Sequence, residues 1–160
     1  MIALLTFLSI TNTIAIAHVQ VYVGNGTVRS VETVTFDETG ILSIGGLAHL
    51  NSTQTTYIEG RGKILTPGLI ETQTQIGLLE IGLEKDTVDD RLENEAVAPA
   101  FRAADGFNPL SMRIPVSSLE GITSALVSPR GSLIYGLGYW FELTGLLQSR
   151  PDPNKPAAMF

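Results

Sequence analysis

Two glutamines, Gln73 and Gln75, are the side chains whose type and spacing invite a chemical interpretation. They lie in the segment TPGLIETQTQIG, Thr66 to Gly77. Side chains two residues apart on a strand project from the same side, so both amides are expected to face one surface. An amide oxygen is neutral and is a poorer ligand than imidazole for zinc. The pair therefore predicts hydrogen bonding and no transition-metal site.

Three interpretations of this pair remain open from the sequence. The first is a buried polar pair that hydrogen-bonds to neighbouring strands or water. The second is a site that binds a substrate or a structural ion without a transition metal. The third is a shift of strand register by one residue, which would turn both amides to the opposite face. Buried amides without partners cost about 1–3 kcal/mol each, so we expect partners for both side chains.

The histidine and acidic residues of the chain, and its lack of cysteine, give little support for other catalytic or metal-binding sites. The chain has no cysteine, which excludes disulfides, thiolate catalysis and thiolate zinc sites. Its two histidines, His18 and His49, do not have the spacing of metal ligands. The acid-rich segment from Glu80 to Glu95 is interpreted as a solvated loop that leads into a helix, because its spacing fits no calcium loop.

Composition indicates a globular chain. The chain has 160 residues, of which 44% are hydrophobic and 16% are charged, too apolar for intrinsic disorder. The net charge is -6 and no basic stripe is present, so nucleic acid is not expected as a partner. Residues 1–13 are interpreted as a signal peptide that is too polar for a stable membrane span. Secreted or periplasmic localisation is expected, with the cytoplasm as the alternative.

The elements that must position the glutamines follow from hydrophobic periodicity. Residues 14–23 alternate as a strand, and glycine-containing turns then separate further short strands up to about Gly46. Residues 14–66 are therefore predicted to form a β-sandwich segment. After Pro67, the run from Leu69 to Leu79 predicts a strand covered on both faces. A short helix at 115–120 and a second buried strand at 122–127 complete a predicted βαβ unit.

The order of these pieces resembles the amidohydrolase superfamily, in particular its imidazolonepropionase-like branch. The segment EGRGKILTPGLIETQTQIG is similar to the family's approach to its first barrel strand, and AHVQVYVGNGTV and FDETGILSIGG resemble the opening strands of its sandwich. FRAADGFNP and IPVSSLEGITSALVSPRGSLIYGLGYWFEL resemble later parts of that branch. The resemblance implies a β-sandwich segment followed by a metal-dependent (β/α)8 barrel, with residues 67–160 as the start of the barrel.

This sequence departs from the family pattern at two places. Gln73 and Gln75 occupy the positions of two histidines that bind a divalent metal, usually zinc, in the family, and Glu71 stands where an aspartate is usual. In addition, a closed barrel takes about 200–250 residues, and fewer than half of these remain after Gly68. We therefore expect an incomplete, truncated barrel, with no metal bound at Gln73 or Gln75.

The resemblance implies a hydrolase that cleaves C–N bonds in amides or cyclic amides. This chain alone is not expected to be catalytically competent, and the sequence assigns no catalytic residue, substrate-binding residue or cofactor. The alternative is a non-catalytic binding or assembly module derived from an amidohydrolase. Because unpaired strand edges associate readily, the expected partner is another copy of the chain or the remaining part of the same barrel.

Overall fold

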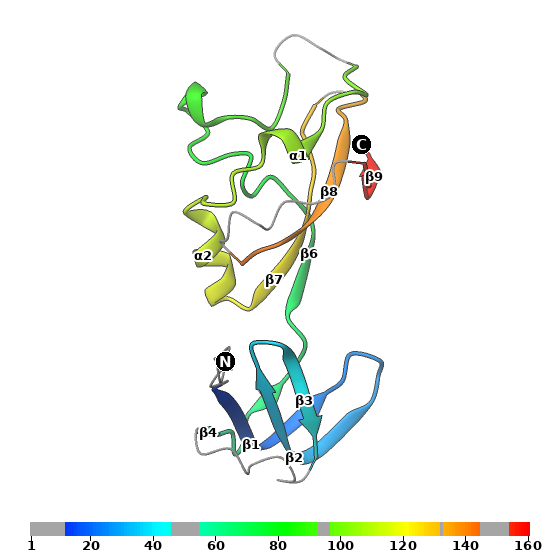
Figure 1. Cartoon of the computed structure of the whole chain (residues 1–160). Coiled ribbons are helices and arrows are strands. Elements are labelled where there is room, and N and C mark those ends of the chain that lie inside the picture. The colour runs from blue at the N-terminus through cyan, green and yellow to red at the C-terminus, as the bar shows by residue number, and fades with distance from the viewer. Residues whose placement is uncertain (1–11, 46–54, 93–96, 132, 145–153) are drawn as a thin grey trace, which may run out of the picture. The chain divides into compact units, whose positions relative to one another are not determined.

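The chain forms two units in the computed structural model, Met1–Pro67 and Gly68–Phe160 (Figure 1). The structure describes residues 12–45, 55–92, 97–131, 133–144 and 154–160. Most of the predicted signal peptide and His49 lie outside these ranges. Within them, no helix has the length and apolar character needed to cross a membrane.

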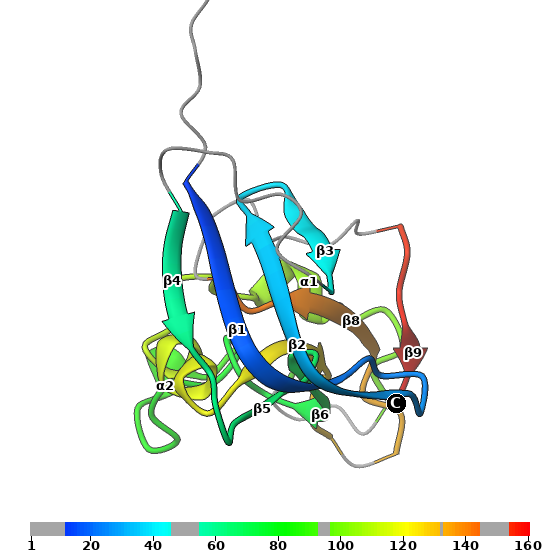
Figure 2. The same cartoon turned by 90° about the horizontal axis from the view of Figure 1, so that it is seen from below.

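The first unit is a single curled sheet of five described strands. They are β1 (Thr13–Tyr22), β2 (Val28–Asp37), β3 (Gly40–Ile44), β4 (Thr55–Glu59) and β5 (Ile64–Leu65). Their order is β3-β2-β1-β4, and β5 also pairs with β1 (Figure 2). The first three strands are antiparallel neighbours, whereas β4 and β5 run parallel to β1. The β-rich character is as predicted, but the described residues contain one sheet in this unit and no second sheet packed on it.

The alternation predicted for β1 is present, but the pairing of β1 with β2 is irregular in its middle. Ala15, Val19 and Val21 are buried, and the two valines pack with Val34 in the core of this unit. His18 has a φ of 58°, and the pairing with β2 shifts between Ile16 and Val19. This bulge inserts an extra residue into β1, with the buried Ala15 before it and the buried Val19 and Val21 after it.

The second unit begins with the predicted parallel pair. Strands β6 (Leu69–Thr74) and β7 (Ile122–Val127) run parallel, and η1 (Lys85–Thr87), α1 (Ala103–Gly106) and α2 (Arg113–Leu119) lie between them in the chain. The bounds of β7 agree with the prediction. The observed α2 begins two residues before the predicted helix, and Gly121 at φ 86° follows its end.

The remaining strands do not continue a barrel pattern. β8 (Leu137–Glu142) pairs antiparallel with β7, and β9 (Ala158–Met159) pairs antiparallel with β8. The connection from Val127 to Leu137 contains no described helix and is too short for a parallel crossover, which takes a dozen residues or more. The chain therefore reverses after β7, and the predicted start of a (β/α)8 barrel is not confirmed beyond its first parallel pair.

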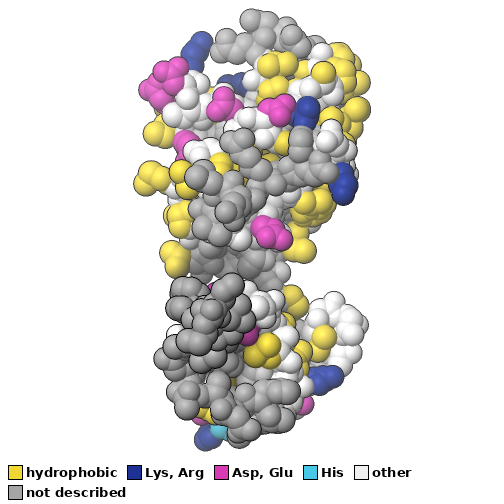
Figure 3. Space-filling view, in the orientation of Figure 1, with side chains coloured by type: hydrophobic (Ala, Val, Ile, Leu, Met, Phe, Trp, Pro, Cys, Tyr) yellow, Lys and Arg dark blue, Asp and Glu magenta, His cyan; other side chains and the backbone are white. Residues whose placement is uncertain are grey.

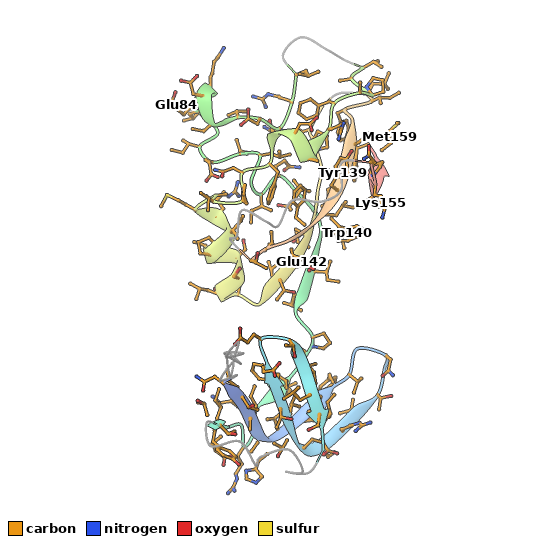
Figure 4. All side chains as sticks on the ribbon, viewed as in Figure 1. Glu84, Tyr139, Trp140, Glu142, Lys155 and Met159 are labelled. Carbon is orange, nitrogen blue, oxygen red and sulfur yellow. The ribbon has the colours of Figure 1, made fainter. Side chains whose placement is uncertain are left out.

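One face of this second sheet carries the core. Ala125, Val127, Tyr139 and Phe141 are almost fully buried, and Phe107 stacks on Phe141 with ring centroids 3.7 Å apart. Between the two buried aromatics on β8 lies Trp140, which is 48% exposed (Figure 4). Strand alternation explains the difference, because neighbouring side chains project to opposite faces.

Candidate functional site

The carboxyl ends of β6 and β7 form the candidate functional site. Polar groups follow both strands, Gln75 after β6 and Ser128 after β7. The amide of Ser128 donates a hydrogen bond of 3.0 Å to the carbonyl oxygen of Thr74, which ties the two ends together. Binding residues commonly lie at the carboxyl ends of parallel strands, where the loops that follow are free to vary.

The two glutamines do not sit on one uninterrupted strand. Gln73 lies within β6, whereas Gln75 follows the strand, which ends at Thr74. Glu71 pairs with Ala125 and Thr74 with Val127, so β6 carries one extra residue in this interval. A bulge of this kind breaks the two-residue repeat, and the assumption of unbroken strand periodicity was therefore wrong.

The two side chains also differ in exposure. Gln73 is exposed, so water can satisfy its amide, and Gln75 is half-buried. The prediction that Leu69 to Leu79 forms a strand covered on both faces is wrong as well, since Leu69 and Ile70 are 56% and 59% exposed. The sequence pattern is apolar enough for burial, but the described residues supply no covering layer here.

Glu71 has a local structural role at the bulge. Its Oε1 atom accepts a hydrogen bond of 3.3 Å from the backbone N–H of Gln73. The carboxylate therefore satisfies an amide in the irregular part of the strand.

The most deeply buried charge near these strand ends belongs to Asp90. Its side chain has no exposed surface, and its Oδ2 lies 3.0 Å from Nη2 of Arg130. The backbone N–H of Arg130 donates to the carbonyl oxygen of Asp90 at 2.6 Å. Within the described residues, neither carboxylate oxygen of Asp90 accepts a hydrogen bond, and neither does Oγ of the buried Ser128. The contact with Arg130 is thus an ion pair outside hydrogen-bond geometry.

Sequence reasoning missed Asp90. The acid-rich segment is largely solvated as predicted, with Glu84, Asp86 and Asp89 exposed, but Asp90 is an exception. Nothing in the local pattern distinguishes Asp90 from its neighbours, because its partner lies after β7. Across the ranges that the structure describes, no group of three or more histidine, aspartate or glutamate side chains is placed to hold a metal ion.

The described histidine, His18, lies in the first unit and pairs with Glu59. Its Nδ1 atom is 3.1 Å from both carboxylate oxygens of Glu59, and the two side chains are 49% and 59% exposed. The hydrogen bond from His18, followed by that from the Arg61 amide, holds the pKa of Glu59 below its ordinary value. This pair joins β1 to the end of β4 and is not part of the β6–β7 strand ends.

Two glycines of the family-like segment are required by close packing. A Cβ atom on Gly60 would overlap the Val19 side chain and lie 2.9 Å from the carbonyl oxygen of Ala17. A Cβ atom on Gly68 would overlap the side chain of Thr123. Both positions thus need glycine for steric reasons that act within their own unit.

The fold of this chain is similar to that of an amidohydrolase from Thermotoga maritima MSB8. The TM-score is 0.72 at 22% sequence identity, and the match covers 91% of this chain and 38% of that chain. A prolidase complexed with N-methylphosphonate-L-proline matches 72% of this chain and 26% of its own at 19% identity, with a TM-score of 0.47. An ochratoxinase from A. niger matches 48% of this chain and 18% of its own at 21% identity, with a TM-score of 0.37.

The likeness to the T. maritima structure is a likeness of fold, and it agrees with the fold expected from the family-like segments. This chain spans 38% of the length of that amidohydrolase. No protein-family model and no curated protein matches the sequence.

Proposed function

We propose that the chain belongs to an amidohydrolase-type hydrolase, whose chemistry is the cleavage of C–N bonds in amides or cyclic amides. The observation that carries this proposal is the fold match over 91% of the chain. The EGRGKILTPGLIE segment supports it, because it resembles the family's approach to its first barrel strand.

We further propose that this chain does not catalyse metal-dependent hydrolysis by itself. Gln73 and Gln75 offer neutral amide oxygens, which are poor ligands for zinc. The bulge in β6 also places the two residues differently, one within the strand and one after it. The donor set at these two positions therefore does not fit a divalent transition metal, and we assign no reaction step to one.

Metal analysis and an activity assay test this proposal together. We expect the purified chain, after incubation with Zn²⁺ or Mn²⁺ and gel filtration, to retain no stoichiometric metal. We expect no hydrolysis of simple amides, dipeptides or cyclic amides above background. Stoichiometric zinc that is lost in Gln73→Ala, or metal-dependent turnover by the unchanged chain, would contradict it. Thr72→Ala is the matched control, since Thr72 is an exposed neighbour on the same strand.

A second candidate function, a non-catalytic assembly module, is favoured by the state of β6. This strand is at one end of the described sheet, so its outer edge has no strand partner among the described residues. Leu69 and Ile70 on it are more than half exposed. An apolar edge strand of this kind accepts a further strand through main-chain hydrogen bonds.

Charging the edge tests the assembly function. We expect Leu69→Lys/Ile70→Lys to abolish strand addition, detected as loss of co-purification with a polypeptide that offers a further β-strand. Ile41→Lys, on an exposed apolar side chain of β3, is the control. Equal binding by the natural chain, Leu69→Lys/Ile70→Lys and Ile41→Lys would eliminate the β6 edge as the assembly surface.

A further inference from the structure

The turn between β1 and β2 carries an asparagine followed by a glycine, Asn25 and Gly26, which none of the proposed functions uses. Both residues are exposed and lie in the bend that separates the two strands. In Figure 3, the loop between β1 and β2 projects from the first unit with a white surface, which marks neutral polar side chains and backbone. Water therefore reaches the Asn25 side chain.

The side chain of Asn25 is folded back onto its own main chain. Its Oδ1 atom accepts a hydrogen bond of 3.0 Å from the backbone N–H of Thr27. A bond of this kind closes an Asx-turn, in which the side chain takes the place of a backbone carbonyl. The ring closed by this bond includes both the carboxamide carbon Cγ of Asn25 and the backbone nitrogen of Gly26. The turn therefore holds these two atoms on one small ring.

The backbone nitrogen of Gly26 has no other engagement. The turn is closed by the Val23 N–H, which donates to the Thr27 carbonyl oxygen at 3.0 Å. Within the part of the chain that the structure describes, the N–H of Gly26 donates no hydrogen bond. Nothing lies within 4 Å of the position that a Cβ atom on Gly26 would take. Approach to this nitrogen is thus hindered neither by a side chain of its own nor by neighbouring atoms.

We propose that Asn25 is a modification site, at which the folded chain converts asparagine to aspartate and isoaspartate through a cyclic imide, with the Thr27 N–H stabilising the reaction. The Gly26 N–H gives its proton to solvent hydroxide, and the nitrogen attacks Cγ of Asn25. The N–Cγ bond forms, the Cγ–Nδ2 bond breaks, and the nitrogen leaves as ammonia after taking a proton from water.

Water then opens the imide at either of its two carbonyl groups. Addition at Cγ breaks the new N–Cγ bond and leaves aspartate with the original backbone. Addition at the main-chain carbonyl breaks the original peptide bond and leaves isoaspartate, whose backbone runs through Cβ and Cγ. Water is the only co-reactant, and both products carry one more negative charge than the natural chain.

The Thr27 N–H lies at the point where charge develops in the first step. Attack on Cγ places negative charge on Oδ1, the atom to which this N–H already donates. A donor positioned in advance at a developing oxyanion lowers the reaction barrier. Three consecutive residues therefore supply the electrophile, the nucleophile and the stabilising donor.

A second asparagine provides a comparison within the same chain. Asn108 is also exposed, and its Oδ1 atom accepts a hydrogen bond of 3.0 Å from the Leu110 N–H. The residue after Asn108 is Pro109, whose nitrogen carries no hydrogen and cannot form the imide. Asn108 thus has the electrophile and the donor without the nucleophile, and it should remain asparagine.

Peptide mapping of the folded full chain tests the proposal. After prolonged incubation at mildly alkaline pH, we expect an Asn25 peptide whose mass shows replacement of –NH2 by –OH and which isoaspartyl methyltransferase labels. Conversion at Asn108 in the same sample should be at least tenfold lower, and Asn25→Gln should abolish the labelling. No conversion at Asn25, or equal conversion at Asn25 and Asn108, would overturn the proposal.

The role of the donor is tested by Thr27→Pro, with Thr27→Ala as its matched control. Proline removes the N–H that bonds to Oδ1, whereas alanine keeps it. We expect Thr27→Pro to slow conversion at Asn25 roughly threefold to tenfold, the effect of one water-exposed hydrogen bond, and Thr27→Ala to leave the rate unchanged. An equal or higher rate in Thr27→Pro would overturn the assigned role.

Hydrogen exchange gives a readout of the product in the fold. The isoaspartyl backbone is longer by one carbon, so the Val23 amide should lose the protection that its bond to Thr27 provides. The Gly45 amide, which donates to the Thr33 carbonyl oxygen at 2.9 Å, should keep its protection. Unchanged protection of Val23 in isolated isoaspartyl protein would contradict the assigned turn geometry. The proposal does not depend on the hydrolase function, which the metal and activity assays test separately.

Discussion

The guanidinium of Arg130 lies 3.0 Å from the carboxylate of Asp90, a side chain with no exposed surface. Asp90 comes from the long connection after β6, and Arg130 from the loop after β7. Since their backbones are also hydrogen-bonded, the pair fixes the loop after β7 against that connection. It is the principal charge pairing at the carboxyl ends of the two strands among the described residues.

Removal of this guanidinium should destabilise the second unit. Arg130→Ala leaves a buried carboxylate without a counter-charge, and breaking such a pair costs about 3–5 kcal/mol when both partners are buried. Arg130 is half-exposed, so we expect a smaller loss of about 2–3 kcal/mol in the free energy of unfolding, measured by urea denaturation. The double variant Asp90→Asn/Arg130→Ala is the control, since it buries no charge. A double variant less stable than Arg130→Ala would refute the explanation.

Gly60 should tolerate no side chain. A Cβ atom there would overlap Val19 and approach the Ala17 carbonyl oxygen, so β1 and the turn after β4 would have to separate. Overpacking of this kind costs about 1–3 kcal/mol, and we expect that loss in the unfolding free energy of Gly60→Ala. Gly82→Ala is the matched control, because nothing lies within 4 Å of its Cβ position. Equal stability of the two variants would show that β1 can move aside.

Truncation of Phe107 should destabilise the core of the second unit and leave the core of the first unit unchanged. Its ring is 2% exposed and stacks on Phe141 at 3.7 Å. Truncation of a buried phenylalanine costs about 3–5 kcal/mol, so Phe107→Ala should lower the protection of β7 and β8 amides against hydrogen exchange. Amides of β1 and β2 should keep their protection, because the two units have separate cores. Leu133→Ala, at a 71% exposed side chain, should change neither.

Local periodicity was sufficient to predict much of the fold. The alternation in β1 and the apolar run at β7 predict those strands, because burial of one or both faces leaves a direct pattern in the sequence. The reversal after β7 was not predicted. It depends on the length and conformation of the connection to β8, which apolar periodicity does not report.

The candidate site was harder to predict from the sequence, because its geometry also depends on pairing between distant segments. The sequence places Gln73 and Gln75 two apart, but the bulge in β6 is a property of its register with β7. The burial of Asp90 likewise depends on Arg130, which is remote in sequence. Both features are set by tertiary pairing, and neither residue type nor spacing along the chain encodes them.

The pH dependence of stability should carry a contribution from Glu59 in the first unit. Its hydrogen bonds from His18 and the Arg61 amide lower its pKa in the folded state below the ordinary value of 4.5. A carboxylate with a lowered folded pKa contributes its full stabilisation above the unfolded pKa and loses it as pH falls through the folded pKa. We therefore expect the stability difference between the natural chain and Glu59→Gln to be constant near neutral pH and to shrink below pH 4.5. Urea denaturation from about pH 7 to about pH 3 measures this difference.

Asp37, whose pKa is lowered by the Thr39 hydroxyl and amide, provides the control, because Asp37→Asn should leave the Glu59 contribution unchanged. A stability difference that persists at the lowest pH would show that the pairing of His18 with Glu59 does not depend on the ionised carboxylate.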